Sequence, residues 1–381
     1  MRGGSRDNPA LEARSVYRFE APPSNLFPNN NLGFRLVRPD SAAAATYAVT
    51  FDINGGSGIT PSAQMANSGT TITLPSGSGF SKTGYTFDGW NTNSSGTGTN
   101  YNAGSSYTVT GDVTLYAKWD IESIYEMVFV PGGSFEMGNP SGGESNERPV
   151  HTVTLTGFYM GKYEVTQAQY QAVMGTNPSK FSGINLPVEQ VTWYDALVFC
   201  NKLSIMEGLT PAYRISGSTD PAAWGTVPTS SNATWNAVEV VGGSTGYRLP
   251  TEAQWEYAAK GGNGSPGNYT YSGSNTVGDV AWYSGNVSYG SGTKAVGTKA
   301  PNGLDLYDMS GNVVEWCWDW YGSYSSEAQT DPQGASSGSN RVARGGSWGY
   351  PVGGVRSASR GRDAPILRSD GFGFRLVRPA Q

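Results

Sequence analysis

Residues able to do nucleophilic, acid–base or metal chemistry are few in this chain. It has one histidine, His151, and two cysteines, Cys200 and Cys317. Both cysteines lie in apolar stretches, VFCNKL and VVEWCWDW, so neither a disulfide framework nor a cysteine zinc cluster is expected. Two separate buried thiols are the simpler interpretation, and one bridge between them is the alternative. A lone histidine in the strand-like PVHTVTL favours a structural role over a Ser–His–Asp triad.

The composition favours irregular structure held by large aromatic side chains. The 381 residues include 53 Gly, 22 Tyr and 11 Trp, and only 14% are charged. The formal net charge is −5, so no nucleic-acid partner is expected. No run of 18 apolar residues occurs, which predicts no transmembrane segment. The first residues contain no apolar region typical of a signal peptide.

One segment occurs twice, at residues 2–39 and 344–379, and one two-residue gap aligns the copies. In the second copy the shared positions are residues 344–347 (RGGS), Pro351, Arg356, Ser357, Arg360, Pro365 and residues 373–379 (GFRLVRP). Glycine, arginine and proline at fixed points can hold a backbone path by turns and hydrogen bonds. The positions between them differ in size and charge, so we expect them to face solvent. A recognition loop and an ordinary permissive surface loop both fit this pattern.

The chain that positions these residues divides into three parts. Residues 1–45 hold the first copy and a linker, DSAAAA, and we expect them to be poorly ordered. Residues 46–120 alternate polar and apolar side chains between Gly-, Ser- and Asn-rich turns, which predicts a small all-β module. Residues 122–381 form one long unit in which helices are expected over 167–174, 193–208 and 251–262. Thr251 is the expected N-cap of the third helix, and Gly261 or Gly262 its C-cap.

Two further groups of side chains in the long unit are given structural interpretations. Trp316, Trp318 and Trp320 alternate along VVEWCWDW, which indicates one face of a strand packed into the core rather than a sugar-stacking surface. The acidic stretch around Glu144 and Glu147 is most simply a solvated loop.

The all-β module resembles a known repeat. The stretch GYTFDGWNTNSSGTGTNYNAGSSYTVTGDVTLYAKW, residues 84–119, is similar to the Listeria–Bacteroides repeat, also called the internalin B-repeat. The resemblance implies a small β-grasp-like fold found in bacterial surface proteins. Such modules act as spacers or adhesive modules, so no chemistry is assigned to this part of the chain.

The long unit resembles the formylglycine-generating enzyme family, also called the sulfatase-modifying factor family. The matching stretches are FVPGGSFEMG, EVTQAQY, PVEQVTWYDALVFCNKLS, YRLPTEAQWEYAAKGG, PNGLDLYDMSGNVVEWCWDWY, RVARGGSW and GFRLV. The resemblance implies an α+β, C-type-lectin-like fold with much irregular structure. Enzymes of the family oxidise a sulfatase cysteine to formylglycine with copper and a cysteine pair in the segment before GFR. The two positions carried over onto this chain are Val352 and Ser357, so neither copper nor enzymatic activity is expected.

The same resemblance suggests a calcium site at DMSGNVVEW. Asp308 and Glu315 would supply carboxylate oxygens, and Gly311 and Val313 backbone carbonyls, to this hard cation. The alternative is that the two acidic side chains accept backbone amides in a tight turn.

The tail, 344–379, resembles the variable region of lectin-fold proteins that retroelements diversify, of which a treponemal surface-displayed type is the nearest kind. Trp348 would pack beneath the site, although the first copy has Arg6 there. We therefore predict a non-enzymatic, surface-displayed or extracellular protein that binds a protein or other macromolecule. A formylglycine-generating oxidase and a calcium-dependent lectin are the alternatives. The expected ligand-binding positions are Gly349, Tyr350, Gly353, Gly354, Ser359, Gly361, Arg362, Asp363, Ala364, Ile366, Leu367, Ser369, Asp370 and Gly371.

Overall fold

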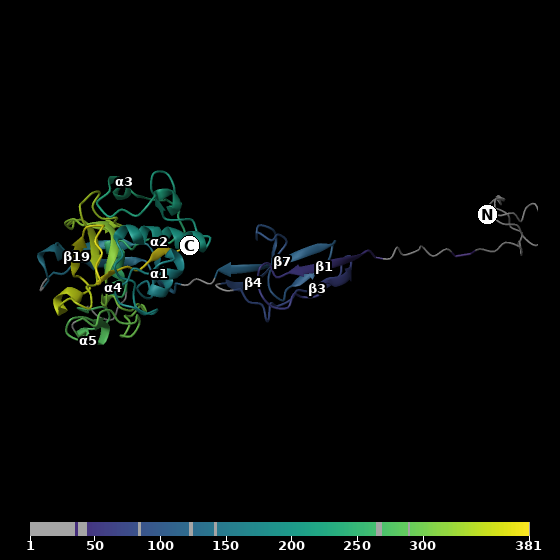
Figure 1. The fold of residues 1–381 in the computed structure, drawn as a ribbon, viewed down its shortest axis with the longest axis horizontal. Helices are drawn as coiled ribbons and strands as arrows, with labels where there is room; N and C mark the ends of the chain where they lie inside the picture. The colour runs from purple at the N-terminus through teal and green to yellow at the C-terminus, as the bar shows by residue number, and fades with distance from the viewer. Residues whose placement is uncertain are drawn as a thin grey trace, which may run out of the picture. The chain divides into compact units, whose positions relative to one another are not determined.

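The computed structural model describes residues 35–36, 44–82, 85–121, 125–140, 143–263, 269–288 and 290–380. The first tail copy lies outside these residues except for Arg35 and Leu36, so the prediction that it is poorly ordered falls on undescribed chain. Residue contacts divide the chain into two units, residues 1–80 with 88–118 and residues 81–87 with 119–381 (Figure 1).

The N-terminal module is a mixed β-sheet. Five strands lie in the order β2-β1-β7-β4-β5, with β1 parallel to β7, and β3 and β6 form a separate antiparallel pair. Val49 and Phe51 of β1 point into the core, where Phe51 lies edge-on to Trp90 at 4.9 Å. Within 44–82 and 85–121 no helix occurs, as the sequence predicts. The strands are β1 (Thr46–Asp52), β2 (Gln64–Asn67), β3 (Thr71–Thr73), β4 (Tyr85–Asn91), β5 (Asn100–Tyr101), β6 (Ser106–Thr108) and β7 (Val113–Ile121).

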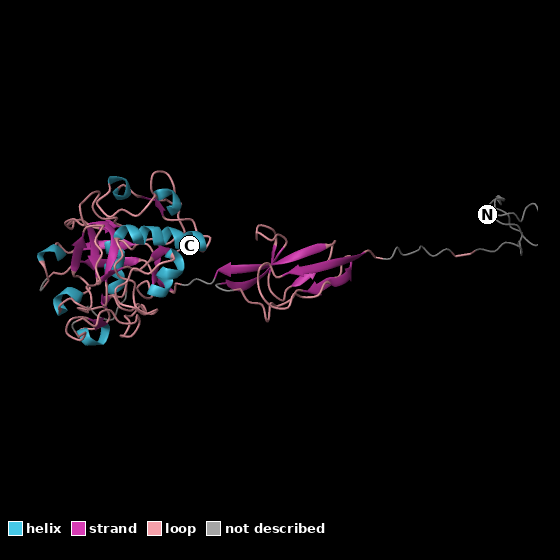
Figure 2. Ribbon diagram, viewed as in Figure 1, coloured by secondary structure: helices cyan, strands magenta, loops and turns pink. Residues whose placement is uncertain are grey.

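The second unit mixes short strands and helices with long irregular segments (Figure 2). This arrangement confirms the predicted α+β fold. Its helices are η1 (Ser145–Glu147), α1 (Gln167–Met174), α2 (Trp193–Met206), η2 (Pro221–Trp224), α3 (Ala233–Asn236), α4 (Glu252–Ala259), α5 (Val277–Val280) and η3 (Val352–Val355). Its strands are β8 (Met127–Val130), β9 (Gly133–Met137), β10 (His151–Leu155), β11 (Phe158–Gly161), β12 (Tyr213–Arg214), β13 (Glu239–Val240), β14 (Ala281–Trp282), β15 (Ser310–Gly311), β16 (Val314–Trp320), β17 (Gln329–Thr330), β18 (Arg341–Arg344), β19 (Arg360–Asp363), β20 (Phe372–Gly373) and β21 (Val377–Pro379).

The sheet β19-β18-β16-β20 carries much of the tail and has a core on both faces. Successive strand residues point to opposite faces, so Trp316 of β16 belongs to the apolar cluster around α2, while Cys317 belongs to the cluster around α4. Likewise, Ala343 of β18 belongs to the cluster around α2, and Val342 belongs to the cluster around α4. Two smaller sheets, β21-β11-β8 and β17-β10-β9, complete the unit, and β21 fixes the end of the tail against β11.

The three predicted helices are confirmed as α1, α2 and α4. Each begins with a threonine capping box, at Thr166, Thr192 and Thr251, in which side chain and backbone satisfy each other's amides. The helix α4 ends at Ala259 with Lys260 as its C-cap, and the predicted Gly261 and Gly262 follow with left-handed φ angles. In the described part of the chain, no helix is long and apolar enough to cross a membrane.

The structure also shows the environments of the two cysteines and of the three tryptophans in β16. Cys200 and Cys317 are both buried free thiols, which excludes the bridge between them. Trp316 is fully buried, and Trp318 stacks on Tyr213 at 5.2 Å, as a core-facing strand requires. The side chain of Trp320 is only partly buried, and the guanidinium carbon of Arg341 lies 3.4 Å from the centre of its ring.

Candidate functional site

Four arginines that recur in both tail copies attach the second copy to the rest of its unit. Arg344, Arg356, Arg360 and Arg375 each form an ion pair with a different carboxylate from outside the tail. The pairs are Arg344–Glu256, Arg356–Glu147, Arg360–Glu252 and Arg375–Glu315. Three of the four are bidentate, a geometry that fixes orientation as well as distance.

Arg375 is the most deeply embedded of these arginines. Its Nε and one terminal nitrogen donate to the two oxygens of Glu315 at 2.6 and 2.7 Å, and both side chains are fully buried. The same terminal nitrogen also donates to the carbonyl of Tyr307 at 2.9 Å, and the other terminal nitrogen donates to the carbonyl of Gly161 at 3.0 Å. Burial opposes the charge on Arg375, but the neighbouring Glu315 outweighs it and raises the pKa of the guanidinium. Arg375 therefore holds three separate segments to the end of the tail.

The helix α4 supplies the acidic partners of two more arginines. Arg360 donates to both oxygens of Glu252 at 2.6 and 2.7 Å. Arg344 donates to Glu256 and also to the carbonyl of Ser357, so it braces the tail against itself. Burial alone would raise the pKa of Glu256, but Lys260 and Arg344 lower it, so the carboxylate stays charged inside the protein.

The interpretation of Glu147 as part of a solvated loop is wrong. Its carboxylate is fully buried and accepts two hydrogen bonds from Arg356, at 2.9 and 2.6 Å. Glu144 is exposed, as expected. The local sequence gives no indication of the pair, because its partner lies 209 residues away along the chain.

The predicted ligand-binding positions lie mostly at the surface. Gly349, Tyr350, Gly353 and Arg362 are exposed, and of the other ten only Gly371 is buried. The exposed fraction of Tyr350 is 40%. Burial of the ring and the neighbouring Asp363 raise the pKa of the Tyr350 hydroxyl, so it remains a neutral hydrogen-bonding group.

The glycines of the tail divide into permissive and constrained positions. A β-carbon at Gly353 would meet nothing within 4 Å, and one at Gly349 only the Ser347 hydroxyl at 3.9 Å. The recurring Gly346 has φ +72°, and a β-carbon there would lie 2.5 Å from the carbonyl oxygen of Gly354. Two predicted variable positions are also tight: Gly361 would meet the Ala343 carbonyl oxygen at 2.9 Å, and Gly371 the Ser347 hydroxyl at 3.1 Å. Side-chain variation is therefore easiest at Gly349 and Gly353.

Two hollows open beside Tyr350 and share its side chain as a wall. The larger has a volume of about 410 Å³ and includes the predicted positions Gly349, Ser369 and Asp370 among its lining residues. The smaller, of about 130 Å³, includes Gly361 and Arg362. The tail thus presents a surface with depth rather than a flat loop.

A segment outside the tail, residues 180–195, supports residues 368–370, which include the predicted positions Ser369 and Asp370. Lys180 pairs with Asp370 at 2.5 Å, and the amide of Gln190 donates to the Ser369 carbonyl at 3.0 Å. Arg368 binds the carboxylate of Asp195 at 2.9 Å. Sequence reasoning missed this support, since no motif marks these residues as partners of the tail.

The two positions carried over from the family's cysteine pair have different environments. Val352 begins η3 and is 47% exposed, while Ser357 is buried and its hydroxyl has no hydrogen-bond partner. Neither is a thiol, and residues 344–379 contain no cysteine at all. The thiols of Cys200 and Cys317 are fully buried, and burial raises the pKa of each, so neither is a ready thiolate.

The two acidic side chains predicted as calcium ligands differ in how far they are already paired. Both oxygens of Glu315 are used, by Arg375 and by the indole N–H of Trp255 at 2.7 Å. Asp308 accepts the amide of Gly297 at 2.7 Å through one oxygen, and its other, buried oxygen has no hydrogen-bond partner. Burial raises the pKa of Asp308 to about 6. The predicted set therefore fits a cation at Asp308 but not at Glu315.

Gly311 and Val313, the other two predicted ligands, belong to the same hydrogen-bond network. The Gly311 amide donates to the Gly345 carbonyl at 2.9 Å, and the Val313 amide to Glu164 at 3.0 Å. The same Glu164 carboxylate accepts the side chain of Asn312 at 2.6 Å. Burial and the nearby Asp308 raise the pKa of Glu164 well above its usual value. Among the described residues, no group of three or more acidic, histidine or cysteine side chains could hold a metal.

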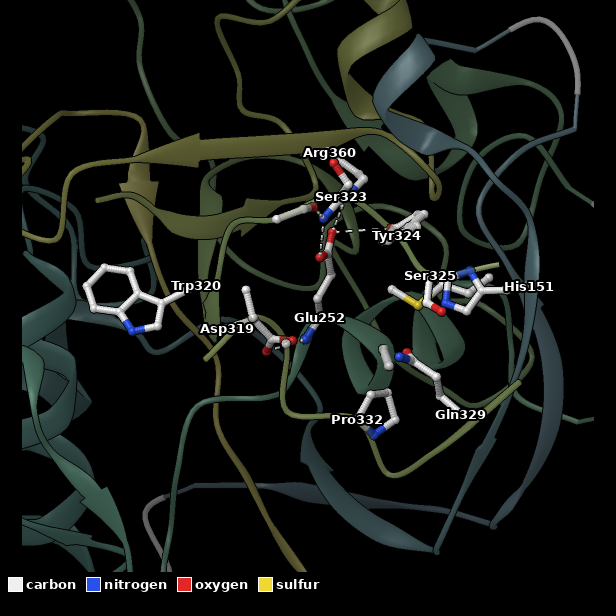
Figure 3. A pocket seen from close by; sticks show the side chains of 15 residues that line it. His151, Glu252, Asp319, Trp320, Ser323, Tyr324, Ser325, Gln329, Pro332 and Arg360 are labelled. Carbon is white, nitrogen blue, oxygen red and sulfur yellow. Dashed lines mark hydrogen bonds and ion pairs between the residues drawn. The ribbon is translucent and has the colours of Figure 1, made fainter. Parts of the chain in front are cut away.

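A third hollow, of about 260 Å³, lies on the α4 side of the sheet and includes His151, Glu252, Asp319 and Tyr324 (Figure 3). Both oxygens of Glu252 are held by Arg360, and Asp319 accepts the Glu252 amide at 2.8 Å, capping α4. Burial and the adjacent Glu252 raise the pKa of Asp319 to about 7. His151 lies against the Tyr324 ring at 5.0 Å, and no described serine is hydrogen-bonded to it. The hollow has no nucleophile–base pair, which agrees with a structural His151.

Comparisons with known proteins agree with this geometry. Residues 114–380 match the family model of the sulfatase-modifying factor enzyme 1-like domain, and residues 47–118 match that of the Listeria–Bacteroides repeat domain. The chain is 42% identical over 270 residues to the Chaperone protein LppX of Paenibacillus barcinonensis, covering 66% of this chain and 89% of that protein. It is 31% identical over 258 residues to the formylglycine-generating enzyme of Thermomonospora curvata, covering 58% and 82%.

Among solved structures, Treponema denticola variable protein 1 aligns with a TM-score of 0.62 and 38% identity, covering 67% of this chain and 95% of that one. The confirmed features are therefore the family fold, the repeat module and the similarity to a variable protein. On the family match over residues 114–380, the chain belongs to the sulfatase-modifying factor family, which is the family of the formylglycine-generating enzymes.

Proposed function

We propose that the C-terminal unit is a non-enzymatic binding module that holds a macromolecular ligand against residues 348–372. The observation that carries the proposal is the division of the tail. Four of the five recurring arginines are paired with carboxylates and three of these are buried, while most of the differing positions are at least partly exposed. A surface whose framework is fixed and whose side chains are free can change its ligand without losing its fold.

The side chains expected to contribute most to binding are the large or charged ones. They are Tyr350, Arg362, Asp363, Ile366 and Leu367. The similarity to a variable protein of Treponema denticola supports this use of the tail, and the absence of cysteine from residues 344–379 argues against the oxidase chemistry of the enzymes. Display at a cell surface is supported by the same similarity and by the Listeria–Bacteroides repeat.

A pair of displayed libraries tests the binding surface. In the first, five variable positions of the full chain that do not pack on the apolar core (Gly349, Tyr350, Gly353, Arg362 and Asp370) are randomised and selected against one immobilised protein, lysozyme. In the control, five exposed apolar positions elsewhere in the unit (Phe129, Ile184, Ile205, Met206 and Val240) are randomised. We expect folded binders mainly from the first library. Equal yields from both libraries would contradict a dedicated binding surface.

Diversification by a retroelement is tested in the surrounding DNA. We expect a near-copy of codons 348–372 that differs almost only at adenines, close to a reverse transcriptase gene. Absence of such a template removes the diversification mechanism but leaves the binding function to the library test.

Each of the two alternative functions predicts an assay result that the proposed binding function does not. The oxidase alternative predicts formylglycine in a sulfatase-motif peptide incubated with the full chain, copper and oxygen, and we expect none by mass spectrometry. The lectin alternative predicts glycan binding that a chelator abolishes. Formation of formylglycine, or chelator-sensitive glycan binding, would replace the present proposal.

A further inference from the structure

The larger hollow beside Tyr350 suggests what kind of group the tail binds. We define it as the anchor pocket, lined by Ser284, Val287, Ser347, Trp348, Gly349, Tyr350, Ser369, Asp370, Gly371 and Phe372. We propose that the anchor pocket receives one aromatic side chain of a protein partner, and that a basic residue next to it in the partner pairs with Asp370. This inference rests on the proposed binding function and deepens it.

The inner wall of the anchor pocket is apolar and held in place. The indole N–H of Trp348 donates to the Asp370 carbonyl at 3.1 Å, and its ring lies edge-on to Phe181 at 5.7 Å. Phe372 and Val287 are almost fully buried beside it. Because the polar end of Trp348 is already satisfied, what remains for a ligand is ring surface, which favours an aromatic group over a polar one.

The negative charge of Asp370 at the rim of the pocket favours a basic residue next to the aromatic residue in the partner. Among the described residues that line the pocket, Asp370 is the one charged side chain. Its partner Lys180 has a side chain that is 59% exposed, so the pair is screened by solvent and contributes little to stability. Arg368 is already bound to Asp195 and to the carbonyl of Gln190. A basic group from a partner can therefore share or replace Lys180 at Asp370 at small cost.

The size and surroundings of the pocket favour a protein over a small free ligand. A volume of about 410 Å³ accommodates a whole aromatic side chain. On the far side of Tyr350 the second hollow continues the surface toward Arg362. A peptide segment can fill both hollows while passing over Tyr350, whereas a single ring fills only one. Buried aromatic anchors surrounded by adjustable contacts are typical of protein interfaces.

The two kinds of wall then have separate tasks. Trp348, Phe372 and Val287 are outside the predicted variable positions, so the inner wall of the anchor pocket does not change when those positions vary. Gly349, Tyr350, Ser369, Asp370 and Gly371 form the rim and change which neighbours the anchor is allowed. The inner wall therefore offers the same ring surface to an aromatic group, while substitutions at the rim change access to the pocket and the neighbours that the aromatic group can have.

Peptide probes and matched variants of the full chain test the proposal. The probes are the acetylated, amidated tetrapeptides Gly-Trp-Arg-Gly, Gly-Trp-Glu-Gly and Gly-Ala-Arg-Gly. Binding is followed at the Trp348 indole N–H resonance, assigned with Trp348→Phe. We expect the first peptide to bind about tenfold more tightly than either of the others, a difference of about 1.4 kcal/mol.

Two glycine substitutions separate the pocket from the rest of the surface. Gly349→Phe places a ring in the anchor pocket, and it needs no backbone change because the position is open. Gly353→Phe, equally open, lies outside the pocket and is the control. We expect Gly349→Phe to weaken Gly-Trp-Arg-Gly about tenfold and the control to leave it unchanged. Asp370→Asn should remove the preference for arginine over glutamate.

Three results would overturn the inference: no shift of the Trp348 resonance at millimolar peptide, equal binding by the two glycine variants, or a preference for the glutamate peptide. These failures are distinguishable from failure of the proposed function. If the displayed libraries still yield binders mainly from the variable positions, the tail is a binding surface whose ligands do not use the anchor pocket. If both fail, the surface itself is excluded.

Discussion

Fixed and variable positions alternate along the same tail, yet they occupy opposite environments. Arg344, Arg360 and Arg375 are buried against carboxylates from other segments, whereas Gly349, Tyr350 and Gly353 face solvent. A few long-range ion pairs therefore attach the tail, and its exposed variable side chains contribute little to stability. Ile366 and Leu367 are exceptions among the variable positions, because they pack against the apolar cluster around α2. This separation shows how a tail can change its ligand while its backbone remains in place.

The strongest test of this comparison replaces one buried arginine that recurs in both copies and one exposed arginine at a variable position. Arg375→Met leaves Glu315 buried without its cation, and breaking such a pair costs about 3–5 kcal/mol. Arg362→Met removes an exposed guanidinium, and surface changes of this kind stay within about 0.5 kcal/mol. Urea unfolding monitored by tryptophan fluorescence measures both. Equal losses in the two variants would end the distinction between fixed and variable arginines.

A second test compares two glycines three residues apart. Gly346→Ala must hold a left-handed φ and bring a β-carbon 2.5 Å from the Gly354 carbonyl oxygen, so we expect a loss of about 2 kcal/mol or more. Gly349→Ala has open space and should change the free energy of unfolding by less than about 0.5 kcal/mol. Thermal unfolding of both variants decides the point. A tolerated alanine at Gly346 would show that the turn relaxes easily.

The third test concerns the scaffold beside the variable loop. Glu189 is fully buried and one of its oxygens has no hydrogen-bond partner. Burial, with a smaller contribution from Asp370, raises the pKa of Glu189 from 4.5 to about 7. Between these values the folded chain binds more protons than the unfolded chain at this residue, so its contribution to stability falls as pH rises and is lowest above about pH 7.

Glu189→Gln removes this dependence because a neutral amide resembles the protonated acid. We expect the variant to be more stable than the unmodified chain by about 1 kcal/mol at pH 8, with the difference lost near pH 4.5. Urea titrations at the two pH values measure it, and Glu144→Gln, at an exposed acid, is the control. An advantage that is the same at both pH values would mean that charge at Glu189 is not the cause.

Local sequence signals were enough for much of the fold. Apolar spacing predicts α1 and α2, and Thr251 is the predicted N-cap of α4, because both signals act within a few residues. Alternation predicts that Trp316 and Trp318 face the core. The comparison of the two tail copies also indicates where solvent-facing side chains lie, because shared residues are constrained and differing ones are not.

The partners of the tail could not be read from the sequence. Arg356 pairs with Glu147 and Arg375 with Glu315, and these separations of 209 and 60 residues leave no local pattern. Glu147 consequently looks like a surface residue, and Glu315 like a cation ligand, until the fold brings their arginines close. The same holds for Lys180 and Gln190, which support Asp370 and Ser369 from another segment.

The smallest expected effect is that of calcium on the thermal stability of the unmodified chain. This measurement tests whether the end of the tail is held by Arg375 or by a bound metal ion. Arg375 already neutralises Glu315, so of the two predicted carboxylate ligands only Asp308 has an unpaired oxygen for calcium. A site filled at a hundred times its Kd would add about 2.7 kcal/mol to the free energy of unfolding, a shift of several degrees in Tm. We expect calorimetry in calcium and in EDTA to agree within about 1 °C. A clear stabilisation by calcium, absent with magnesium and lost in Asp308→Asn, would show that the cation binds beside Arg375 and that the ion pair is not the sole support of this end of the tail.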